Sequence, residues 1–449
     1  MARGRAEEFV LDFDEPGPVH DGGADAPGRA ERRRKIRGVP RPLVLWAAVS
    51  VVLVVAGVLT MPPPPPGPNW GVGPSWSSPP VEQWTVPLES PTDELTELWI
   101  GADAVLVAGA DRLDAYDRAD GTVRWSVTDV QRCTVLDAGV DADADAVAQE
   151  LAVCVSGSGA DAGVAIIGTD GAVRQVVVPG AASASLHGED LVVLTERAEA
   201  EYELTLYAGL EPSQVRWSAS VEFPALPAGA DLAGDQTPRV RVLAGDRVLL
   251  NTGGLYSAAT GEKVPGSWSA STGEGALVSW EGERTRLILP GTDEVLEWPG
   301  LGWLSVIDDG SSPALIIRVS ETDGSSIEAV TWDGDVLWRG AQRWPVARFG
   351  DILLLSGPDT GAIRASTGTE LWSIPDQLTC PCRGDASGLL VYALDYGPAS
   401  LIGARLIGLR PADGEVLWEI PLDEGVLVAD TDEAIAVLVD GQLTLYSRT

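Results

Sequence analysis

The chain has 449 residues, and its 66 acidic against 31 basic residues give a formal net charge of −35 at pH 7. A protein this acidic repels the phosphates of nucleic acids, which excludes nucleic acid as a partner. The 51 glycines and 32 prolines, with short runs of valine and leucine between them, indicate many short strands joined by turns and therefore an all-β class.

Residues 1–42 are the first predicted segment, a disordered cytoplasmic tail. They lack apolar periodicity and carry nine basic against eight acidic residues. Seven of the basic residues lie between Arg29 and Arg41, directly before an apolar run. We expect this juxtamembrane cluster to contact anionic lipid headgroups.

Residues 43–61, LVLWAAVSVVLVVAGVLTM, contain no charged residue and are predicted to cross the lipid bilayer as a single helix. At about 1.5 Å per residue this helix spans roughly 28 Å, close to the hydrocarbon thickness of a bilayer. The basic cluster before it, with no basic residue after it until Arg112, predicts a cytoplasmic N-terminus and an extracytoplasmic remainder. A cleaved signal peptide is the alternative, which the long segment before the apolar run and the lack of a clear cleavage site disfavour.

Residues 62–80 are rich in proline and begin with five consecutive prolines. Such a run favours the extended polyproline II conformation, at about 3.1 Å per residue. We interpret this segment as an extracytoplasmic stalk. A docking site for a proline-recognition module is the alternative.

Residues 81–449 contain a repeated hairpin in which a glycine is followed, four residues later, by a tryptophan. In each copy a strand-like run ends in a polar turn, and a second short strand contains the tryptophan. The four pairs are Gly121 and Trp125, Gly334 and Trp338, Gly368 and Trp372, and Gly414 and Trp418. The recurrence of one such hairpin unit along the chain predicts a β-propeller or a solenoid.

The two ends of this region predict how a propeller would close. The strand-like segment around Trp84 has no hairpin before it, and the last segment, which contains Leu445, lacks the tryptophan strand that should follow. Joining the two would complete one blade and remove two open sheet edges. The interval between Trp268 and Trp298 is short for a four-stranded blade, so we expect about eight blades.

The best copy of the hairpin is AYDRADGTVRW, which ends at Trp125. It resembles the PQQ-like β-propeller repeat of the quinoprotein alcohol dehydrogenase-like superfamily, commonly written A-x-D-x-x-T-G-x-x-x-W, and departs from it in Asp120. The resemblance covers roughly residues 81–449. It implies a propeller whose tryptophans dock between neighbouring blades, which suits an indole with a large apolar area and one N–H donor.

The resemblance does not extend to a cofactor site. Members of the superfamily that use PQQ carry a pair of adjacent cysteines near the cofactor, with carboxylate and amide ligands for calcium. The nearest feature here is Cys380-Pro381-Cys382, in which a proline separates the cysteines. We therefore expect no cofactor and interpret the chain as a non-catalytic member of the superfamily.

Other catalytic or metal-binding patterns are weak. His187 is the one histidine after the predicted membrane segment, and we interpret it as a surface residue rather than a zinc ligand or part of a triad. Carboxylate pairs are too numerous for their spacing to single one out.

Asp141, Asp143 and Asp145 alternate as in a calcium loop and are a weak metal candidate. An EF-hand loop needs a glycine where Ala146 stands and an acid where Ala152 stands. A solvated acidic loop is therefore the favoured interpretation.

All four cysteines follow the predicted membrane segment, in an oxidising space. Cys133 and Cys154 lie on successive strand-like runs and are the first predicted disulfide, because neighbouring antiparallel strands bring such residues close. Cys380 and Cys382 are then left to each other. Pairing with the first two cysteines, or a redox C-x-C motif, are the alternatives.

The sequence thus favours a non-enzymatic, membrane-anchored propeller that binds an envelope protein or polymer outside the cell membrane. One alternative is an enzyme, either PQQ-dependent or carbohydrate-active through carboxylates in the central channel. Another is a single-pass sensor of an extracellular ligand. A single helix joined through a flexible proline stalk would transmit a conformational change poorly, which disfavours this alternative.

Overall fold

A computed structural model shows two compact units, Met1–Pro64 and Pro65–Thr449, and the residues that the structure describes all belong to the second. The described residues are 69–88, 95–135, 150–157, 162–198, 201–222, 239–243, 246–270, 277–281, 284–288, 295–303, 305–310, 315–320, 326–331, 335–341, 343–357, 359–396, 401–422 and 427–449. The predicted tail, residues 1–42, and the predicted membrane segment, residues 43–61, lie outside them. Within the described residues, no helix is long and apolar enough to cross a membrane.

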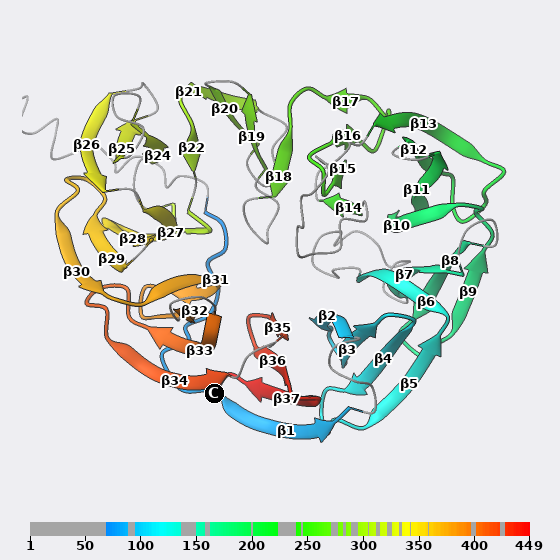
Figure 1. Cartoon of the computed structure of the whole chain (residues 1–449), viewed down its shortest axis with the longest axis horizontal. Helices are drawn as coiled ribbons and strands as arrows, with labels where there is room; N and C mark the ends of the chain where they lie inside the picture. Colours follow the sequence, from blue (N-terminus) through cyan, green and yellow to red (C-terminus); the bar gives the residue numbers. More distant parts are fainter. Residues whose placement is uncertain are drawn as a thin grey trace, which may run out of the picture. The chain divides into compact units, whose positions relative to one another are not determined.

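The described strands form nine sheets, antiparallel apart from one short pair, that follow one another as the blades of a β-propeller (Figure 1). We number the blades from 1 to 9 and give the strands of each from its innermost outward. Blades 1 to 3 are β2 (Leu95–Ile100), β3 (Ala104–Gly109), β4 (Arg112–Asp117) and β5 (Val123–Thr128); β6 (Val130–Val135), β7 (Glu150–Ser156), β8 (Gly163–Gly168) and β9 (Val173–Val176); and β10 (Ala181–His187), β11 (Asp190–Ala198), β12 (Glu201–Tyr207) and β13 (Val215–Glu222).

The strands of the next three blades are shorter. Blades 4 to 6 are β14 (Val240–Leu243), β15 (Arg247–Leu250), β16 (Leu255–Ser257) and β17 (Lys263–Val264); β18 (Trp268–Ala270), β19 (Leu277–Glu281), β20 (Arg284–Ile288) and β21 (Val295–Pro299); and β22 (Gly302–Trp303), β24 (Leu315–Val319), β25 (Ser326–Thr331) and β26 (Val336–Ala341).

The last three blades include one extra strand, β23 (Ile307–Asp308), which pairs parallel to β27 at the inner edge of blade 7. Blades 7 to 9 are β27 (Trp344–Phe349), β28 (Ile352–Ser356), β29 (Thr360–Arg364) and β30 (Glu370–Ile374); β31 (Gln377–Asp385), β32 (Gly388–Tyr396), β33 (Leu401–Leu409) and β34 (Val416–Leu422); and β35 (Leu427–Asp430), β36 (Ala434–Val439), β37 (Gln442–Ser447) and β1 (Val81–Pro87).

Blade 9 combines the two ends of the propeller, as the sequence predicts. β1 pairs antiparallel with β37, and Trp84 lies opposite Leu445. The first strand of the propeller is therefore the outermost strand of its last blade, beside the C-terminus in Figure 1. This pairing removes two open edges and closes the ring.

The expected number of about eight blades is wrong, because the described strands form nine. The interval from Trp268 to Trp298, judged too short for a blade, contains all of blade 5. Its four strands have only three to five residues each, yet they pair in register, with Trp268 opposite Ser279 and Thr285 opposite Trp298. Strands this short need less chain than the other copies of the repeat suggest.

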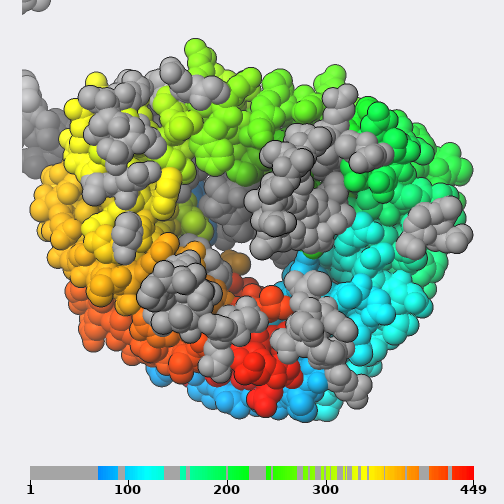
Figure 2. Space-filling model, in the orientation of Figure 1, coloured from blue at the N-terminus to red at the C-terminus, as the bar shows by residue number. Residues whose placement is uncertain are grey.

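The core is divided among the interfaces between blades. Each of nine clusters of buried side chains joins two consecutive blades of the described part. Because a blade is covered on both faces, its second strand can be apolar on both sides: all six residues of β3, AVLVAG, are buried. The described strands surround a central opening (Figure 2).

The up-and-down order of strands gives the propeller two distinct faces. Turns between first and second strands, and between third and fourth strands, lie on one face, which we call the hairpin face. Turns between second and third strands, and the links from one blade to the next, lie on the opposite face, which we call the connection face.

Residues 69–80, predicted as part of an extended stalk, instead pack against the hairpin face, and we call this segment the strap. Trp70 forms an isolated bridge with Asp308, and the Trp76 N–H donates to the Gly388 carbonyl at 3.0 Å. Both tryptophans are buried, Trp76 completely. Burial of two large indoles explains why a segment of prolines, glycines and serines follows the propeller surface. Residues 62–68 of the predicted stalk lie outside the described residues.

Candidate functional site

Tryptophans on the outermost strands lie between blades and connect five of the described blades to the next one along the chain. The ring of Trp84 packs under Gly121 of blade 1, whose φ of 73° requires glycine, and its Nε1–H donates to the Arg118 carbonyl at 2.9 Å. Trp125, Trp217, Trp338 and Trp372 donate in the same way to the following blade, to the carbonyls of Thr169, Ala258, Ala365 and Pro411. Gly368 and Gly414 lie against Trp338 and Trp372, and Gly334 lies outside the described residues.

The interface between blades 8 and 9 replaces the usual turn with the strap. Blade 9 has no chain link between β37 and β1, so it lacks the turn that would meet the indole of Trp418. The Trp418 Nε1–H donates instead to the Trp76 carbonyl at 2.6 Å, and the two rings lie 6.4 Å apart. The strap therefore supplies the missing part of the repeat.

Three of the four cysteines are disulfide-bonded in the described part of the chain. Cys133 on β6 and Cys154 on β7 are joined by a disulfide, with their Cα atoms 4.0 Å apart. Cys382 is buried and disulfide-bonded. The side chain of Cys380 lies outside the described residues, so its pairing stays a prediction.

The other residues considered from the sequence do not form a site in the described part. Asp141, Asp143 and Asp145 lie outside it, and the described residues contain no group of acids, histidines or cysteines that could hold a metal ion. His187 ends β10, and its Nε2 lies 2.8 Å from the carboxylate of Asp246. This contact links blades 3 and 4.

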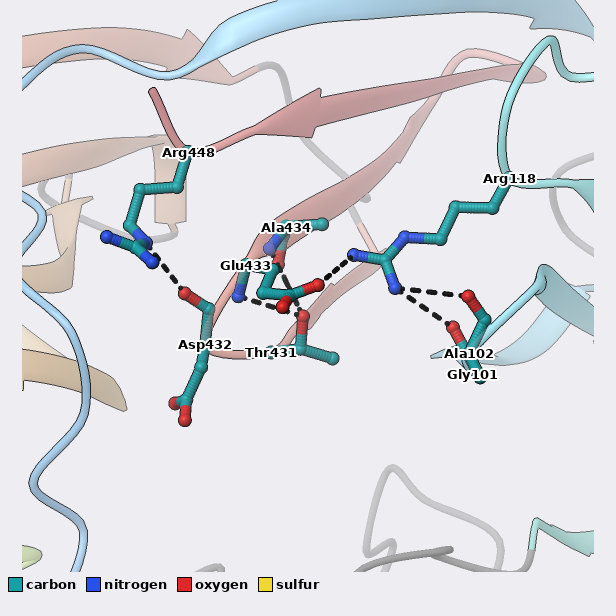
Figure 3. A network of polar contacts seen from close by, with 8 residues as sticks. All are labelled: Gly101, Ala102, Arg118, Thr431, Asp432, Glu433, Ala434 and Arg448. Carbon is teal, nitrogen blue, oxygen red and sulfur yellow. Dashed lines mark hydrogen bonds and ion pairs between the residues drawn. The ribbon is translucent and has the colours of Figure 1, made fainter. Parts of the chain in front are cut away.

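A network of polar contacts ties blades 9 and 1 together on the hairpin face (Figure 3). Arg118 contacts the Glu433 carboxylate at 3.1 Å and donates to two carbonyls of the turn before β3. Arg448 donates to the Asp432 carbonyl. The pocket beside this network is open, and Arg124, its second arginine, donates to the Asp103 carbonyl. Of these arginines, Arg118 links the two blades that close the ring, whereas Arg124 and Arg448 donate within blades 1 and 9.

Buried charges lie near the innermost strands and are paired. Asp430 on β35 accepts from Arg383 on β31 at 2.8 Å, which links blades 8 and 9. Burial raises the pKa of Asp430, and the positive charge of Arg383 offsets part of the rise. In blade 7, burial likewise raises the pKa of Asp308, and Arg348 offsets part of it. Each carboxylate has its own arginine, as a structural ion pair requires.

The connection face carries a cluster of exposed apolar side chains that the repeat does not explain. This aromatic cluster consists of Trp280 at the end of β19, Leu301 in the link to β22, Trp303 on β22 and Trp344 at the start of β27. These strands belong to blades 5, 6 and 7, which are neighbours in Figure 1. Trp280, Leu301 and Trp344 are 38%, 40% and 44% exposed.

Contacts within the cluster make it continuous. The rings of Trp303 and Trp344 meet edge to face, with centroids 4.5 Å apart and planes at 81°. The Trp280 Nε1–H donates to the Gly302 carbonyl at 3.0 Å, which places it beside Trp303. Tryptophans are the side chains most enriched among residues that dominate binding energy. The cluster therefore has the chemistry of a binding surface, although the sequence analysis did not identify it.

The comparisons with known proteins add little to this description. No protein-family model and no curated protein sequence matches the chain. Among solved structures, BamB from Moraxella catarrhalis is similar with 13% identity and a TM-score of 0.44, over 82% of this chain and 100% of that one. KlHsv2 with loop 6CD replaced by a Gly-Ser linker is similar with 11% identity and a TM-score of 0.33, over 73% of this chain and 97% of that one. The assignment as a β-propeller rests on the sheets themselves.

Proposed function

We propose that this β-propeller is a non-enzymatic scaffold, anchored in the cell membrane by residues 43–61, which binds an envelope protein or polymer on its outer side. The observation that carries the proposal is the aromatic cluster of Trp280, Leu301, Trp303 and Trp344. Trp344 is exposed and meets the half-buried Trp303, and such partly exposed aromatic groups on one face of a domain are typical of interaction surfaces. The non-catalytic PQQ-like assignment belongs to the same proposal and is supported by the repeat.

The extracytoplasmic position is supported by two features of the chain. The uncharged segment of residues 43–61 follows a basic cluster, which favours a cytoplasmic N-terminus. The disulfide between Cys133 and Cys154 is typical of an oxidising compartment. The cysteine pair supports this placement independently of hydropathy.

The location is tested by cysteine labelling in intact cells. Val177, which is 76% exposed between β9 and β10, is replaced by cysteine. A maleimide that cannot cross membranes is expected to label this variant before lysis. Labelling only after the cells are permeabilised would contradict the extracytoplasmic position.

The binding function is tested by covalent cross-linking in cells followed by purification of the propeller. The wild-type chain is expected to carry cross-linked envelope material, and the double variant Trp303→Ala, Trp344→Ala is expected to lose it. Val177→Ala, which shortens an exposed side chain elsewhere on the connection face, is the matched control. Equal recovery from all three proteins would refute a role for the cluster.

A further inference from the structure

The aromatic cluster exposes indole surface that suits a positively charged ligand. The rings of Trp303 and Trp344 meet edge to face, so they are not stacked on each other. Trp344 remains 44% exposed, and Trp303 is half-buried beside it. The face of an indole carries negative charge density and attracts the ammonium of lysine or the guanidinium of arginine.

The negative charge of the propeller also favours positively charged partners. Residues 81–449 carry 22 basic and 58 acidic residues, a net charge of −36. A field of this sign raises the association rate of cationic partners and opposes anionic polymers. At the cluster itself, Glu281 follows Trp280 directly, and its side chain is 63% exposed beside Arg286.

The position of the cluster leaves it accessible in the closed ring. The strap packs on the hairpin face, where Gly73 and Trp76 donate to the carbonyls of Gly384 and Gly388. The cluster lies on the connection face, because Trp344 begins an innermost strand and Leu301 lies in a link between blades. An occupant of the cluster would therefore not compete with the strap.

We propose that the aromatic cluster binds a protein segment in which arginine or lysine stands beside apolar residues. The cation lies over the exposed indole surface of the Trp303–Trp344 pair, and the apolar residues pack against Leu301 and Trp280. This inference rests on the proposed scaffold function and names its partner class. A neutral glycan stacked on the indoles is a different proposal, which the experiment distinguishes.

The test measures binding of labelled peptides to the full chain in detergent micelles by fluorescence anisotropy. The probe is a short peptide of alternating arginine, leucine and serine, and the comparison peptide has glutamate at each arginine position. We expect the arginine peptide to bind at least about tenfold more tightly at about 0.05 M salt, and more weakly at about 0.5 M salt. Trp303→Ala and Trp344→Ala should each weaken it by about tenfold or more, and the control Val177→Ala should not.

Four results would overturn the proposal: no binding of the arginine peptide, equal binding of the glutamate peptide, unchanged binding to both tryptophan variants, or displacement of the peptide by a neutral N-acetylglucosamine oligomer. The third result would mean attraction by net charge alone, and the fourth would indicate a glycan. If the peptide fails but the cross-linked envelope material still depends on Trp303 and Trp344, only the partner class is wrong. If both fail, the scaffold function fails with it.

Discussion

Trp76 and Trp418, the two tryptophans at the interface of blades 8 and 9, should respond differently to the same substitution. Trp76 is completely buried, but its Nε1–H has no hydrogen-bond partner in the part of the chain that the structure describes. Trp418 is also buried, and its Nε1–H donates to the Trp76 carbonyl at 2.6 Å. The same change, tryptophan to phenylalanine, therefore removes an unsatisfied donor at one site and a hydrogen bond at the other.

The magnitudes follow from these contacts. Phenylalanine buries roughly 40 Å² less than tryptophan, which costs about 1 kcal/mol at either site. In Trp76→Phe this loss is offset, because burying an unpaired donor costs about 1–3 kcal/mol. In Trp418→Phe the Trp76 carbonyl is left unpaired, so the two costs add. We expect the free energy of unfolding to stay unchanged or rise by up to about 2 kcal/mol for Trp76→Phe, and to fall by about 2–4 kcal/mol for Trp418→Phe.

Chemical denaturation of the unit Pro65–Thr449, followed by circular dichroism, measures the difference. Trp76→Ala is the companion variant and should lose about 3–5 kcal/mol, since it removes a completely buried indole. Equal losses for Trp76→Phe and Trp418→Phe would refute the assignment of donor and acceptor. A negligible loss for Trp76→Ala would show that the strap is not part of the propeller core.

Three further predictions concern stability. Replacing Cys133 and Cys154 together by serine should lower the free energy of unfolding by about 3 kcal/mol, given a sequence separation of 21 residues, and no loss on denaturation would contradict this. Arg383→Met should cost about 3 kcal/mol at pH 7, because Asp430 is left buried without its partner. Because the pKa of Asp430 is raised in the folded protein, its carboxylate takes up a proton at a higher pH than in the unfolded chain. The cost of Arg383→Met should therefore shrink as the pH falls towards about 4. A cost independent of pH would refute the pairing. Gly388→Ala would place a Cβ 2.2 Å from the Ser77 nitrogen and should expose the strap to proteases, whereas the control Gly340→Ala has 3.6 Å of clearance and should not.

The closure of the ring could be predicted from the sequence because it depends on a local signal. The tryptophan strand around Trp84 lacked a preceding hairpin and the last segment lacked a following one, and both belong to blade 9. The number of blades could not be counted in the same way. In blade 5 the strands are so short that the interval between Trp268 and Trp298 was judged too short for a four-stranded blade.

The strap was missed because its composition is that of a linker. Prolines, glycines and serines outnumber Trp70 and Trp76 in the strap, so its average composition is that of a linker. The residues that contact the two tryptophans lie hundreds of positions away in the sequence. One signal was present. Trp76 precedes Trp84 by eight residues, and Arg118, which accepts from the previous indole in the ring, precedes Trp125 by seven. The spacing of the repeat therefore continues into the strap.

The aromatic cluster could not be predicted because its members share no motif. Trp280 and Trp303 do not follow a glycine at the repeat spacing, and Gly340, four residues before Trp344, lies on β26 rather than in a turn. The three tryptophans come together only through the packing of blades 5, 6 and 7. Tryptophans that depart from the repeat were the available signal. Trp125 and Trp338 donate hydrogen bonds to the following blade, whereas the tryptophans of the cluster do not have this position in the repeat.

Photo-cross-linking in living cells tests the central claim that the connection face binds the partner. A photoreactive amino acid is placed at Leu301, inside the aromatic cluster, and in a second protein at Val72, which is 39% exposed on the strap. The account predicts a discrete cross-linked product from position 301 that disappears when Trp344 is replaced by alanine, and none from position 72. A product from position 72 alone, or one from position 301 that persists without Trp344, would contradict it.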